Sequence, residues 1–433
     1  MGDMKKLAEL VKELQGRLAV CMRCGLCRSV CPIFAQTGRE PDVARGKLAL
    51  LDGIIEGVFR GPRGVNDQLR RCLLCGACGA NCPSGVKTLE LFLKARALLA
   101  GYLKLSPLKR LLFRALLPHP KVFDRLLEWG SGLQGIFLKP VDDFLGTSCG
   151  RVPSPLSGRR RLKAPALVPF HRRVSSLDRP AGKSGLRVGF FVGCLIDKVF
   201  PNVAEAILEA LEKHGVGVFL PGDLGCCGIP ALSAGDATAF GRLVRHNLEK
   251  LTSEPFDFLV TGCATCTATI RNLWPVLYPD IEDGKRAQVR ALAAKTLDIS
   301  QFLADKAGPL HGTGPTSGDA VPLAYHDPCH LAKSLGVTAQ PRALLRANGL
   351  YRFEEMAEAD ECCGCGGSFN LEHYDLSASI GRRKRENIAR SGCKTVATGC
   401  PACMLQLSDM LSQAGDRIRV KHAVEIYAEV LRP

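Results

Sequence analysis

Hydrophobic and polar positions divide the chain from residue 186 onward into alternating strand-like and helix-like segments. Short apolar runs such as LRVGFFVG end at a cysteine and are followed by stretches of helical periodicity such as residues 203–213. Strands that alternate with helices indicate α/β units with mainly parallel strands. The order strand, cysteine, helix, strand, Cys-Cys-Gly, helix, strand, Cys-x-x-Cys, helix occurs twice, which predicts two repeated α/β domains over residues 186–310 and 311–433.

The chain before residue 186 follows a different pattern. Residues 1–100 begin with a charged amphipathic segment and carry two dense cysteine motifs, which predicts a small N-terminal domain. Residues 101–185 hold an apolar, helical stretch and then, from residue 151, a basic, proline-rich linker. The helical stretch either packs against the protein or lies on a partner or a membrane surface. The linker is either a solvated tether or a basic strap on an acidic partner or a lipid surface.

Composition limits where such a chain works. Its 433 residues are 46% hydrophobic, enough for two or three packed domains, and 21 are cysteines. The first residues lack the apolar core and cleavage pattern of a secretory signal, so we expect reduced cysteines in the cytoplasm that are available for metals. No apolar run approaches the length of a membrane-spanning helix. We therefore expect a cytoplasmic protein, either free or peripheral at the inner face of the membrane.

The net charge of +16 raises the question of a nucleic-acid partner. Only 6% of residues are aromatic and no nucleic-acid-binding motif is present, so we expect no such partner. Anionic metal–thiolate centres on the many cysteines would offset much of the excess positive charge.

The two N-terminal motifs, CMRCGLCRSVCP and CLLCGACGANCP, share the spacing C-x2-C-x2-C-x3-C-P. This is the bacterial-ferredoxin arrangement, in which short loops offer backbone N–H groups to the sulfurs and the fourth cysteine reaches the other cluster. We predict one [4Fe-4S] cluster on the first four-cysteine set, which is Cys21, Cys24, Cys27 and Cys82. The second four-cysteine set, Cys72, Cys75, Cys78 and Cys31, is predicted to hold another. Zinc is the alternative, which the third cysteine and the trailing prolines disfavour.

Four arginines lie near these motifs: Arg23, Arg28, Arg70 and Arg71. They either raise the reduction potentials of the clusters or are ordinary surface residues.

Each α/β repeat carries five cysteines. The first five-cysteine set is Cys194, Cys226, Cys227, Cys263 and Cys266, and the second is Cys329, Cys362, Cys363, Cys400 and Cys403. The gaps within the sets are nearly equal, at 31 and 35 residues in the first and 32 and 36 in the second. Adjacent cysteines do not easily reach two corners of a cubane, but they suit an opened cluster in which irons share a sulfur. A vicinal disulfide is the alternative for each pair, although it would strain the backbone and leave Cys-x-x-Cys unexplained.

These patterns resemble those of known redox proteins. The pairing of CCG with a later CxxC resembles the cysteine-rich domain of heterodisulfide reductases. The segments CMRCGLCRSVCPIF, ARGKLALLDGIIEG and LRRCLLCGACGANCPSGVK follow the order of the glycolate oxidase iron–sulfur subunit family. The resemblance covers nearly the whole chain, least distinctively over residues 101–185. It extends to the iron–sulfur proteins of D-lactate dehydrogenase, the C subunit of anaerobic glycerol-3-phosphate dehydrogenase and the D subunit of heterodisulfide reductase.

The resemblance implies a fold of mixed α+β and α/β class. A helical, bacterial-ferredoxin-like domain with two [4Fe-4S] clusters would precede two α/β cysteine-rich (CCG) domains. It also implies that each five-cysteine set binds a non-cubane [4Fe-4S] cluster. Some relatives keep one such cluster or hold zinc in the other site, so the occupancy of each set stays open.

Three cysteines remain outside these sets. Cys149 and Cys393 are expected to be ordinary thiols, whereas Cys365, inside ECCGCGGSF, has either no special role or a redox or substrate-facing one. His326 and His330 flank Cys329 and either donate hydrogen bonds to a cluster or relay protons, or are simply satisfied histidines at a strand end.

The chain shows no flavin or nicotinamide fingerprint and no nucleophile–base arrangement. We therefore expect an electron-transfer subunit of an oxidoreductase complex with no catalytic residue of its own. An FAD-containing partner would oxidise a 2-hydroxy acid such as glycolate or D-lactate, and electrons would pass through the clusters to a quinone or another carrier. The alternatives are a subunit whose CCG clusters reduce a disulfide, and a zinc-stabilised interaction protein.

Overall fold

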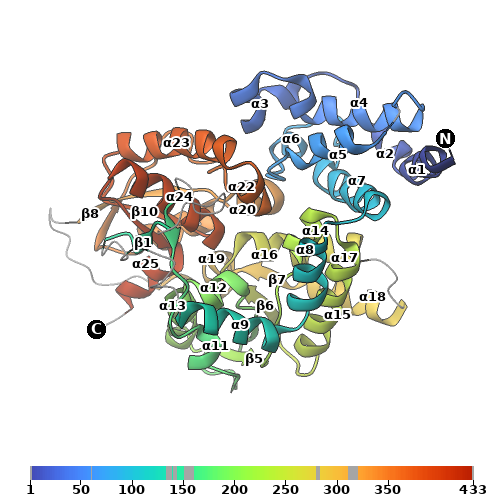
Figure 1. The fold of residues 1–433 in the computed structure, drawn as a ribbon. Coiled ribbons are helices and arrows are strands. Elements are labelled where there is room, and N and C mark those ends of the chain that lie inside the picture. The colour runs from blue at the N-terminus through green and yellow to red at the C-terminus, as the bar shows by residue number, and fades with distance from the viewer. Residues whose placement is uncertain are drawn as a thin grey trace.

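The computed structural model describes residues 2–59, 61–132, 139, 144–150, 160–278, 283–310 and 320–431. Three parts lie side by side in Figure 1: a helical unit at the N-terminus, in blue, and two α/β units, in green to yellow and in orange to red. None of the helices in these residue ranges combines the length and the apolar character that crossing a membrane requires.

The N-terminal helical unit is made of short helices joined by cysteine-bearing loops. Its elements are α1 (Gly2–Lys12), α2 (Gln15–Leu18), η1 (Leu26–Arg28), α3 (Pro32–Thr37), η2 (Glu40–Asp42), α4 (Ala44–Ile55), α5 (Arg63–Arg70), α6 (Ala77–Ala80) and α7 (Thr88–Leu103). Proline stands in the first turn of α3, where its missing N–H costs nothing. Helix α7 buries Leu91, Leu93, Ala95 and Leu99 against the other helices and so forms the spine of the unit.

The segment between the helical unit and the α/β units packs on the protein along much of its length. It contains α8 (Pro107–Leu111), η3 (Leu112–Leu116), α9 (Pro120–Gly132), β1 (Thr147–Ser148), β2 (Leu162–Lys163), α11 (Phe170–Arg173) and β3 (Leu177–Arg179). The first residues of the expected linker, 151–159, lie outside the described residues. The expectation of a solvated tether is wrong for its described remainder, because β3 pairs with a strand of the first α/β unit and Phe170 is buried.

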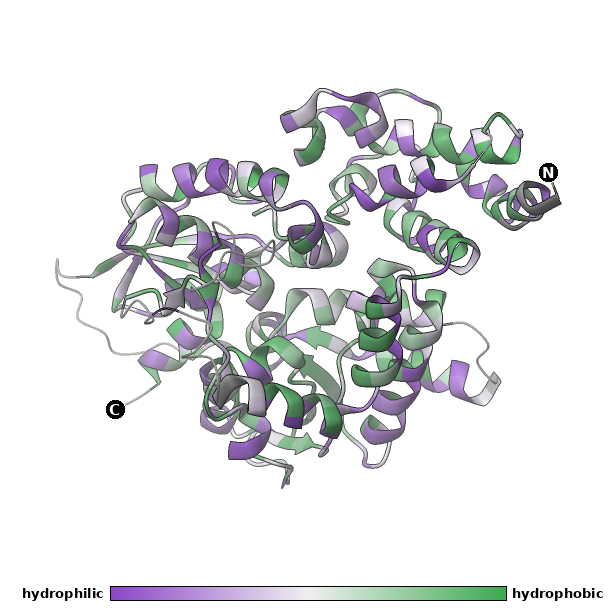
Figure 2. Ribbon diagram, viewed as in Figure 1, coloured by the Kyte–Doolittle hydropathy of each residue, from purple (hydrophilic) through white to green (hydrophobic). Residues whose placement is uncertain are grey.

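The first α/β unit has a five-stranded sheet of order β3-β5-β4-β6-β7, in which only β3 is antiparallel to its neighbour. Its strands are β4 (Arg187–Phe190), β5 (Gly217–Leu220), β6 (Phe258–Thr261) and β7 (Thr296–Asp298). The hydrophobic colour of Figure 2 follows these strands, as expected for a sheet that helices cover. The helices are α12 (Cys194–Lys198), α13 (Pro201–Lys213), α14 (Ile229–Ala234), α15 (Ala237–Leu251), α16 (Ala264–Ala268), η4 (Thr269–Leu273), α17 (Trp274–Leu277), α18 (Asp283–Ala294), α19 (Ile299–Phe302) and η5 (Leu303–Ala307).

The second α/β unit repeats this topology. Its parallel sheet has the order β11-β10-β8-β9, with β8 (Val321–His326), β9 (Tyr351–Phe353), β10 (Thr395–Thr398) and β11 (Arg419–His422). Its helices are α20 (Cys329–Leu335), α21 (Ala339–Arg346), α22 (Ser368–Glu372), α23 (Tyr374–Arg390), α24 (Pro401–Ala414) and α25 (Ala423–Val430). Taken strand by strand, β9-β8-β10-β11 corresponds to β5-β4-β6-β7, so the predicted fold class and internal repeat are confirmed.

The two α/β units pack through equivalent elements. Helix α16 contacts α20 and α12 contacts α24, while α13 contacts α25 and α19 contacts α21. Each contact therefore has a counterpart with the roles of the units exchanged, as an approximate two-fold axis between them requires. The segments ATC (264–266) and PAC (401–403) lie near that axis. There the Ala264 N–H donates to the carbonyl of Gly399 at 3.1 Å.

Candidate iron–sulfur centres

The two cysteine motifs of the helical unit share one backbone conformation. Arg23 and Leu74 hold the same place in the two motifs and have φ values of 58° and 56°. Left-handed backbone is uncommon outside glycine and marks a loop whose shape is dictated by its surroundings. The Leu74 N–H donates to the sulfur of Cys72 at 3.5 Å, which agrees with the expectation that these loops offer N–H groups to their sulfurs.

Cysteines of the two motifs lie close together. One cavity is lined by Cys21, Cys24 and Cys27 of the first motif together with Cys78 and Cys82 of the second. Cys31 lies instead against the second motif. Burial raises the pKa of Cys31 to about 12, and the nearby thiols of Cys72 and Cys75 contribute to that rise. Each fourth cysteine therefore sits beside the other motif's first three.

Carboxylates engage all four arginines that the sequence placed near the motifs. Arg71 pairs with Asp42 at 2.9 Å and Arg70 with Glu372 at 2.6 Å, whereas the pairs Arg23–Asp52 and Arg28–Glu40 are longer, at 3.5 and 3.9 Å. A buried cation near the motifs is Lys47 on α4, which is 0% exposed. Burial lowers the pKa of Lys47, while the nearby thiols of Cys72 and Cys31 oppose that shift. A fixed positive charge here would stabilise a reduced, more anionic cluster.

Sequence patterns gave one weak signal for Lys47. It stands on the buried side of the helical pattern ARGKLALL, between positions that the core occupies. A lysine at such a place is either paired or functional. Its Nζ donates to the backbone carbonyls of Asp42 and Pro41, at 2.5 and 3.1 Å, so those carbonyls hold the charge in place.

The five-cysteine sets lie at the carboxyl ends of the strands. Cys194 and Cys263 follow the adjacent strands β4 and β6, and Cys329 and Cys400 follow β8 and β10. Each of these cysteines stands at or just before the start of a helix, where open parallel sheets place their ligands. The structure therefore agrees with the predicted position at strand ends.

Glycines shape the loops that carry the adjacent cysteines. Gly228 and Gly364 follow the two pairs and have φ values of 94° and 88°, a region that favours glycine. A Cβ on Gly366 would lie 2.6 Å from the Leu73 side chain, so this glycine lets the second α/β unit approach the helical unit closely. All 21 cysteines are free thiols in the structure, the adjacent pairs included.

In both sets the second cysteine of the pair has its pKa lowered well below the ordinary value. Side-chain hydrogen bonds to Cys226 and then to Cys266 cause the shift at Cys227. Hydrogen bonds to Cys362 and then to Cys403 do the same at Cys363. Because the thiolate is the form that ligates metal, equivalent positions in the two units favour the ligating form.

The cysteines form one continuous series of sulfur contacts. It begins in the helical unit, where the Cys75 side chain hydrogen-bonds to Cys362. Within the second unit, Cys362 contacts Cys363, the sulfurs of Cys363 and Cys403 are 3.4 Å apart, and Cys403 contacts Cys400. Cys400 contacts Cys263 across the approximate two-fold axis. In the first unit the series continues through Cys266, Cys227 and Cys226 to Cys194, the last two sulfurs lying 3.7 Å apart.

The two histidines of HDPCH differ in surroundings. His330 bridges three parts of the molecule, with Nε2 2.9 Å from the Leu74 carbonyl and Nδ1 3.0 Å from the Thr265 hydroxyl. It is thus a satisfied structural residue. His326 is fully buried and has a ligand atom within 4.8 Å of the sulfurs of Cys363 and Cys403. Burial, and next the charge of Lys384, lower the pKa of His326 to about 3, so the ring is neutral.

The remaining cysteines are also placed. Cys365 is close to the second five-cysteine set. Burial raises the pKa of Cys365, and the nearby Cys363, Cys400 and Cys362 raise it further. Cys393 is buried and approaches the Ile388 carbonyl at 3.7 Å, in agreement with an ordinary thiol. Cys149 is half-buried beside the short β1–β2 ribbon.

Sequence reasoning missed Arg96, which ties the helical unit together and to the first α/β unit. Its buried guanidinium donates to the carbonyls of Leu69, Cys72 and Ser233, at 2.6, 2.9 and 2.9 Å. These acceptors come from two segments that lie apart from Arg96 in the sequence, so no local pattern marks the residue.

Comparison with known proteins places these features in a family. The family described as "4Fe-4S dicluster domain" matches residues 17–86, and the family described as "Cysteine-rich domain" (CCG) matches residues 188–271 and 323–408. These segments include the two four-cysteine motifs and both five-cysteine sets.

Three relatives match this chain over different lengths. The probable glycolate oxidase iron-sulfur subunit of Bacillus subtilis is 27% identical, over 99% of this chain and 97% of the relative. Lactate utilization protein A of an Exiguobacterium species is 30% identical, over 56% of this chain and 97% of the relative. The D subunit of the dihydromethanophenazine:CoB–CoM heterodisulfide reductase of Methanosarcina barkeri is 25% identical, over 96% of this chain and 94% of the relative. Together the family matches and these relatives support a redox role with iron–sulfur clusters for this chain.

Proposed function

Because the chain belongs to the family of iron–sulfur proteins that join a 4Fe-4S dicluster domain to two cysteine-rich CCG domains, as the glycolate oxidase iron-sulfur subunit does, we propose that it is the electron-transfer subunit of a flavin-dependent 2-hydroxyacid dehydrogenase complex. An FAD-containing partner oxidises glycolate or D-lactate. The present chain takes the electrons from that partner and passes them to a quinone or another carrier.

The proposed cofactors are four iron–sulfur clusters. The two four-cysteine sets hold [4Fe-4S] cubanes, and the two five-cysteine sets hold non-cubane [4Fe-4S] clusters. When bound, such clusters accept and release one electron at a time. The cysteines fit this role, since they are free thiols gathered in groups at loops and helix starts.

The described residues form no compact group of four cysteines around one point, which is the arrangement that a four-cysteine zinc ion requires. Four-coordinate zinc draws all its ligands within about 2.3 Å of one ion. Among the described residues, the ligand groups that lie mutually within 4.8 Å contain no more than two cysteine sulfurs. A multi-iron cluster accommodates thiolates that stand further apart.

The observation that carries the proposal is the unbroken series of sulfur contacts from Cys75 to Cys194. It links the helical unit to both α/β units through the interior of the molecule. Electron transfer requires closely spaced centres, whereas a purely structural metal protein has no need to align its sites. Arg96 and His330 fix the helical unit against the other two parts and so preserve this alignment.

The test is reduction of the clusters by the physiological donor. The chain is purified anaerobically with its flavoprotein partner, and its visible and electron paramagnetic resonance spectra are followed on adding glycolate or D-lactate. Reduction within the turnover time of the flavoprotein is expected. Clusters that stay oxidised while the flavin is reduced would refute the proposal.

A second function, disulfide reduction, is favoured by one observation. Contact between Cys263 and Cys400 sets the two five-cysteine sets side by side, so that two single electrons are available at neighbouring sites. The relative from Methanosarcina barkeri, which matches 96% of this chain, is named for heterodisulfide reduction. Turnover of a low-molecular-weight disulfide by the reconstituted chain, with reduced dye as donor, would establish this function instead.

A further inference from the structure

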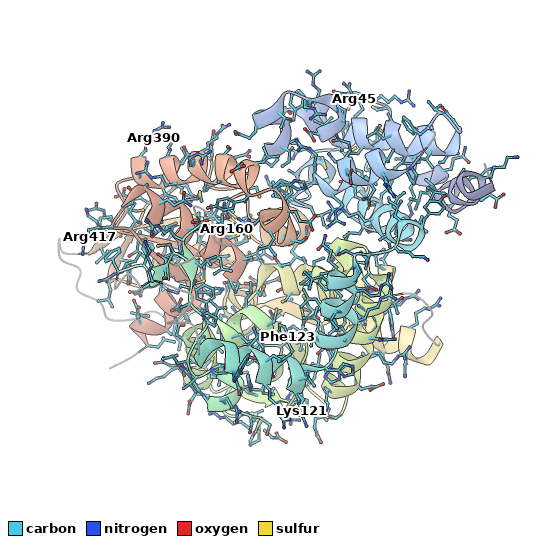
Figure 3. All side chains as sticks on the ribbon, viewed as in Figure 1. Arg45, Lys121, Phe123, Arg160, Arg390 and Arg417 are labelled. Atoms are coloured by element: carbon cyan, nitrogen blue, oxygen red, sulfur yellow. The ribbon has the colours of Figure 1, made fainter. Side chains whose placement is uncertain are left out.

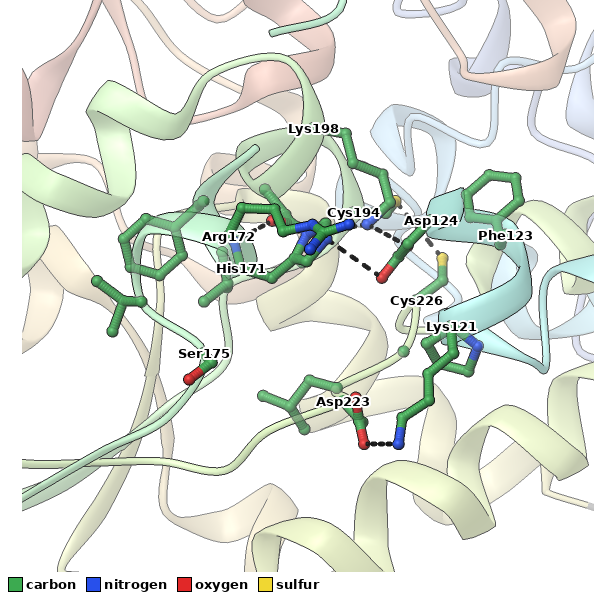
Figure 4. Close-up of a pocket in the computed structure, with 18 of the residues that line it drawn as sticks. Lys121, Phe123, Asp124, His171, Arg172, Ser175, Cys194, Lys198, Asp223 and Cys226 are labelled. Carbon is green, nitrogen blue, oxygen red and sulfur yellow. Dashed lines mark hydrogen bonds and ion pairs between the residues drawn. The ribbon is translucent and has the colours of Figure 1, made fainter. Parts of the chain in front are cut away.

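A two-lobed cavity, lined in part by residues of helix α9, opens beside Cys194. Figure 4 shows Cys194, Lys198, His171 and Phe123 around its polar lobe. The polar lobe has a volume of about 450 Å³ and includes His171, Arg172, Asp197 and Cys226 in its lining. The apolar lobe has about 280 Å³ and includes Leu112, Phe113, Leu127, Leu195 and Val199. Phe123, Asp124, Cys194 and Lys198 line both lobes, so a ligand spanning them would lie against Cys194.

The matching place in the second α/β unit is covered by protein. Cys329 corresponds to Cys194, and its nearest sulfur neighbours are Cys362 and then Cys75 of the helical unit. The first unit has the cavity where the second has the helical unit. The sulfur series therefore begins against the helical unit and ends beside a cavity. An electron that enters through Cys75 has its exit at Cys194.

The polar lobe is an ion-pair network. Its acidic groups and His171 are close enough to suggest a cation site, but these carboxylates already form ion pairs with protein side chains. Lys198 pairs with Asp197 and, at 2.8 Å, with Asp124. The His171 ring lies 2.9 Å from Asp197 and 3.0 Å from Glu128, which also pairs with Arg172. An ammonium has three donors and these carboxylates take two of them, which leaves one for a ligand in the cavity.

Resting on the proposed function, we propose that this cavity binds a lipophilic quinone and is the place where the electrons leave the chain. The quinone ring lies between Phe123 and Cys194, one ring oxygen accepts a hydrogen bond from Lys198, and the substituents or tail occupy the apolar lobe. Reduction adds two electrons and two protons. The quinone becomes a quinol, with one proton on each ring oxygen.

Electrons and protons reach the ligand from opposite sides. The two electrons come from the 2-hydroxy acid oxidised by the flavoprotein, and arrive singly through the Cys194 set. The protons come from solvent through the polar lobe, where His171 stands between carboxylates. The hydrogen bond to Asp197 holds the pKa of His171 above its ordinary value against the effect of burial. The ring therefore holds a proton more tightly than a free imidazole does, and it can hand that proton on.

Two features select a quinone over other acceptors. The wall of the apolar lobe suits a ligand with a large apolar portion, which excludes hydrophilic dyes and nucleotides. The adjoining ammonium and carboxylate–histidine network suits a ligand whose polar atoms gain negative charge and then protons. A protein carrier would meet α9 and not the interior of the cavity.

The decisive experiment measures binding of duroquinone to the full chain, isolated anaerobically with its clusters. Duroquinone has a fully substituted ring, so it cannot add to the protein's thiols. Leu127 and Leu126 are neighbours on α9, at 36% and 49% exposure, but only Leu127 lines the cavity. We expect Leu127→Gln to weaken binding at least about tenfold, since it puts a polar group in an apolar wall. Leu126→Gln is the matched control and should leave the dissociation constant unchanged.

A second variant tests the polar end. Lys198→Gln keeps an N–H donor and removes the charge, so binding should weaken only a few-fold while quinol formation with reduced chain falls about a hundredfold. Equal dissociation constants for wild type, Leu127→Gln and Leu126→Gln would overturn the proposal, as would the absence of binding. Displacement of duroquinone by a disulfide that is then reduced would overturn it in favour of the disulfide reductase.

The two proposals fail in different ways. If glycolate or D-lactate reduces the clusters through the flavoprotein but duroquinone does not bind, the quinone site is wrong and the proposed function stands. If duroquinone binds and depends on Leu127, yet no 2-hydroxy acid reduces the chain, the site stands and the assigned donor is wrong.

Discussion

His326 is a buried histidine whose ring nitrogens make no hydrogen bond of good geometry with the described part of the chain. A buried polar group without a partner costs free energy, so its presence calls for a ligand beside it. The nearby sulfurs belong to Cys363 and Cys403 of the second five-cysteine set. Phe191 stands three residues before Cys194, as His326 stands three residues before Cys329. The two sets are therefore equal in cysteines and unequal in hydrogen-bond donors.

Replacing His326 by Phe, the residue of the first unit, is expected to lower the reduction potential of the second set. A neutral hydrogen bond contributes about 1 kcal/mol, which for one electron corresponds to a shift on the order of 50 mV. Redox titration monitored by electron paramagnetic resonance measures the shift. Iron content should stay at the wild-type value, and His326→Gln, which keeps an N–H, should shift the potential less. An unchanged potential in His326→Phe would mean that the ring does not reach the cluster.

Arg96 offers a stability prediction at the same scale. Its guanidinium satisfies buried carbonyls of the cysteine loop and of α14, so Arg96→Met leaves those acceptors without a donor. We expect a loss of about 3 kcal/mol in the stability of the joint between the helical unit and the first α/β unit. Hydrogen exchange should quicken over residues 69–76 and 231–235. Lys94→Met on the same helix is the control. Equal exchange in both variants would contradict a tethering role for Arg96.

At the scale of elements, helix α9 has two apolar faces. Phe123 and Leu127 point to the cavity, whereas Val122, Leu126 and Trp129, spaced four and three residues apart, form an exposed stripe. Figure 3 shows Lys121 and Phe123 on this helix, in front of the first α/β unit. Lys121 and Arg125 flank the stripe and are exposed. One face therefore packs on the protein, whereas the other is exposed, and its binding to a lipid surface stays a prediction.

The stripe predicts binding to vesicles that contain phosphatidylglycerol. Apolar side chains would enter the headgroup region and the cations would meet the lipid charge. The double variant Leu126→Glu and Trp129→Glu should reduce the partition coefficient at least about tenfold. Trp129 is 72% exposed and Trp274 fully buried, so a blue shift of fluorescence on binding reports the α9 face. Leu371→Glu, at an exposed leucine of α22, is the control. Equal partitioning of all three proteins would exclude this face.

At the scale of the whole molecule, the sequence predicts what depends on local order and repetition. Cys194 and Cys329 end strand patterns, and their nearly equal distances to the adjacent-cysteine pairs revealed the repeat that the two sheets share. The prolines and arginines of residues 160–185 indicated a linker. Instead β3 and Phe170 pack there, because their partners are strands and helices far along the chain. Lys47, Arg96 and the cavity at Cys194 likewise arise from segments that meet only in three dimensions.

The approximate two-fold axis explains why two similar units have different tasks. It brings the equivalent residues Cys263 and Cys400 into contact and so joins the two five-cysteine sets. The helical unit lies against the second unit's outer cysteine, Cys329, whereas α9 faces the first unit's outer cysteine, Cys194, across the cavity. The two similar sites therefore differ in their neighbours, and we expect electrons to pass from Cys75 towards Cys194.

This direction predicts that equivalent substitutions in the two units leave different clusters reducible by the donor. In Cys362→Ser the series is broken next to the helical unit, so donor electrons should reach the cubanes and stop there. In Cys226→Ser the break lies beside Cys194, so the cubanes and the second five-cysteine set should still be reduced. Quinone reduction should fall at least about a hundredfold in both. Freeze-quenched samples resolve which clusters take electrons, and iron analysis confirms that only the altered set is lost. If Cys226→Ser still reduced duroquinone at the wild-type rate, electrons would have to leave before the first unit, and the direction assigned to the series would be reversed or false.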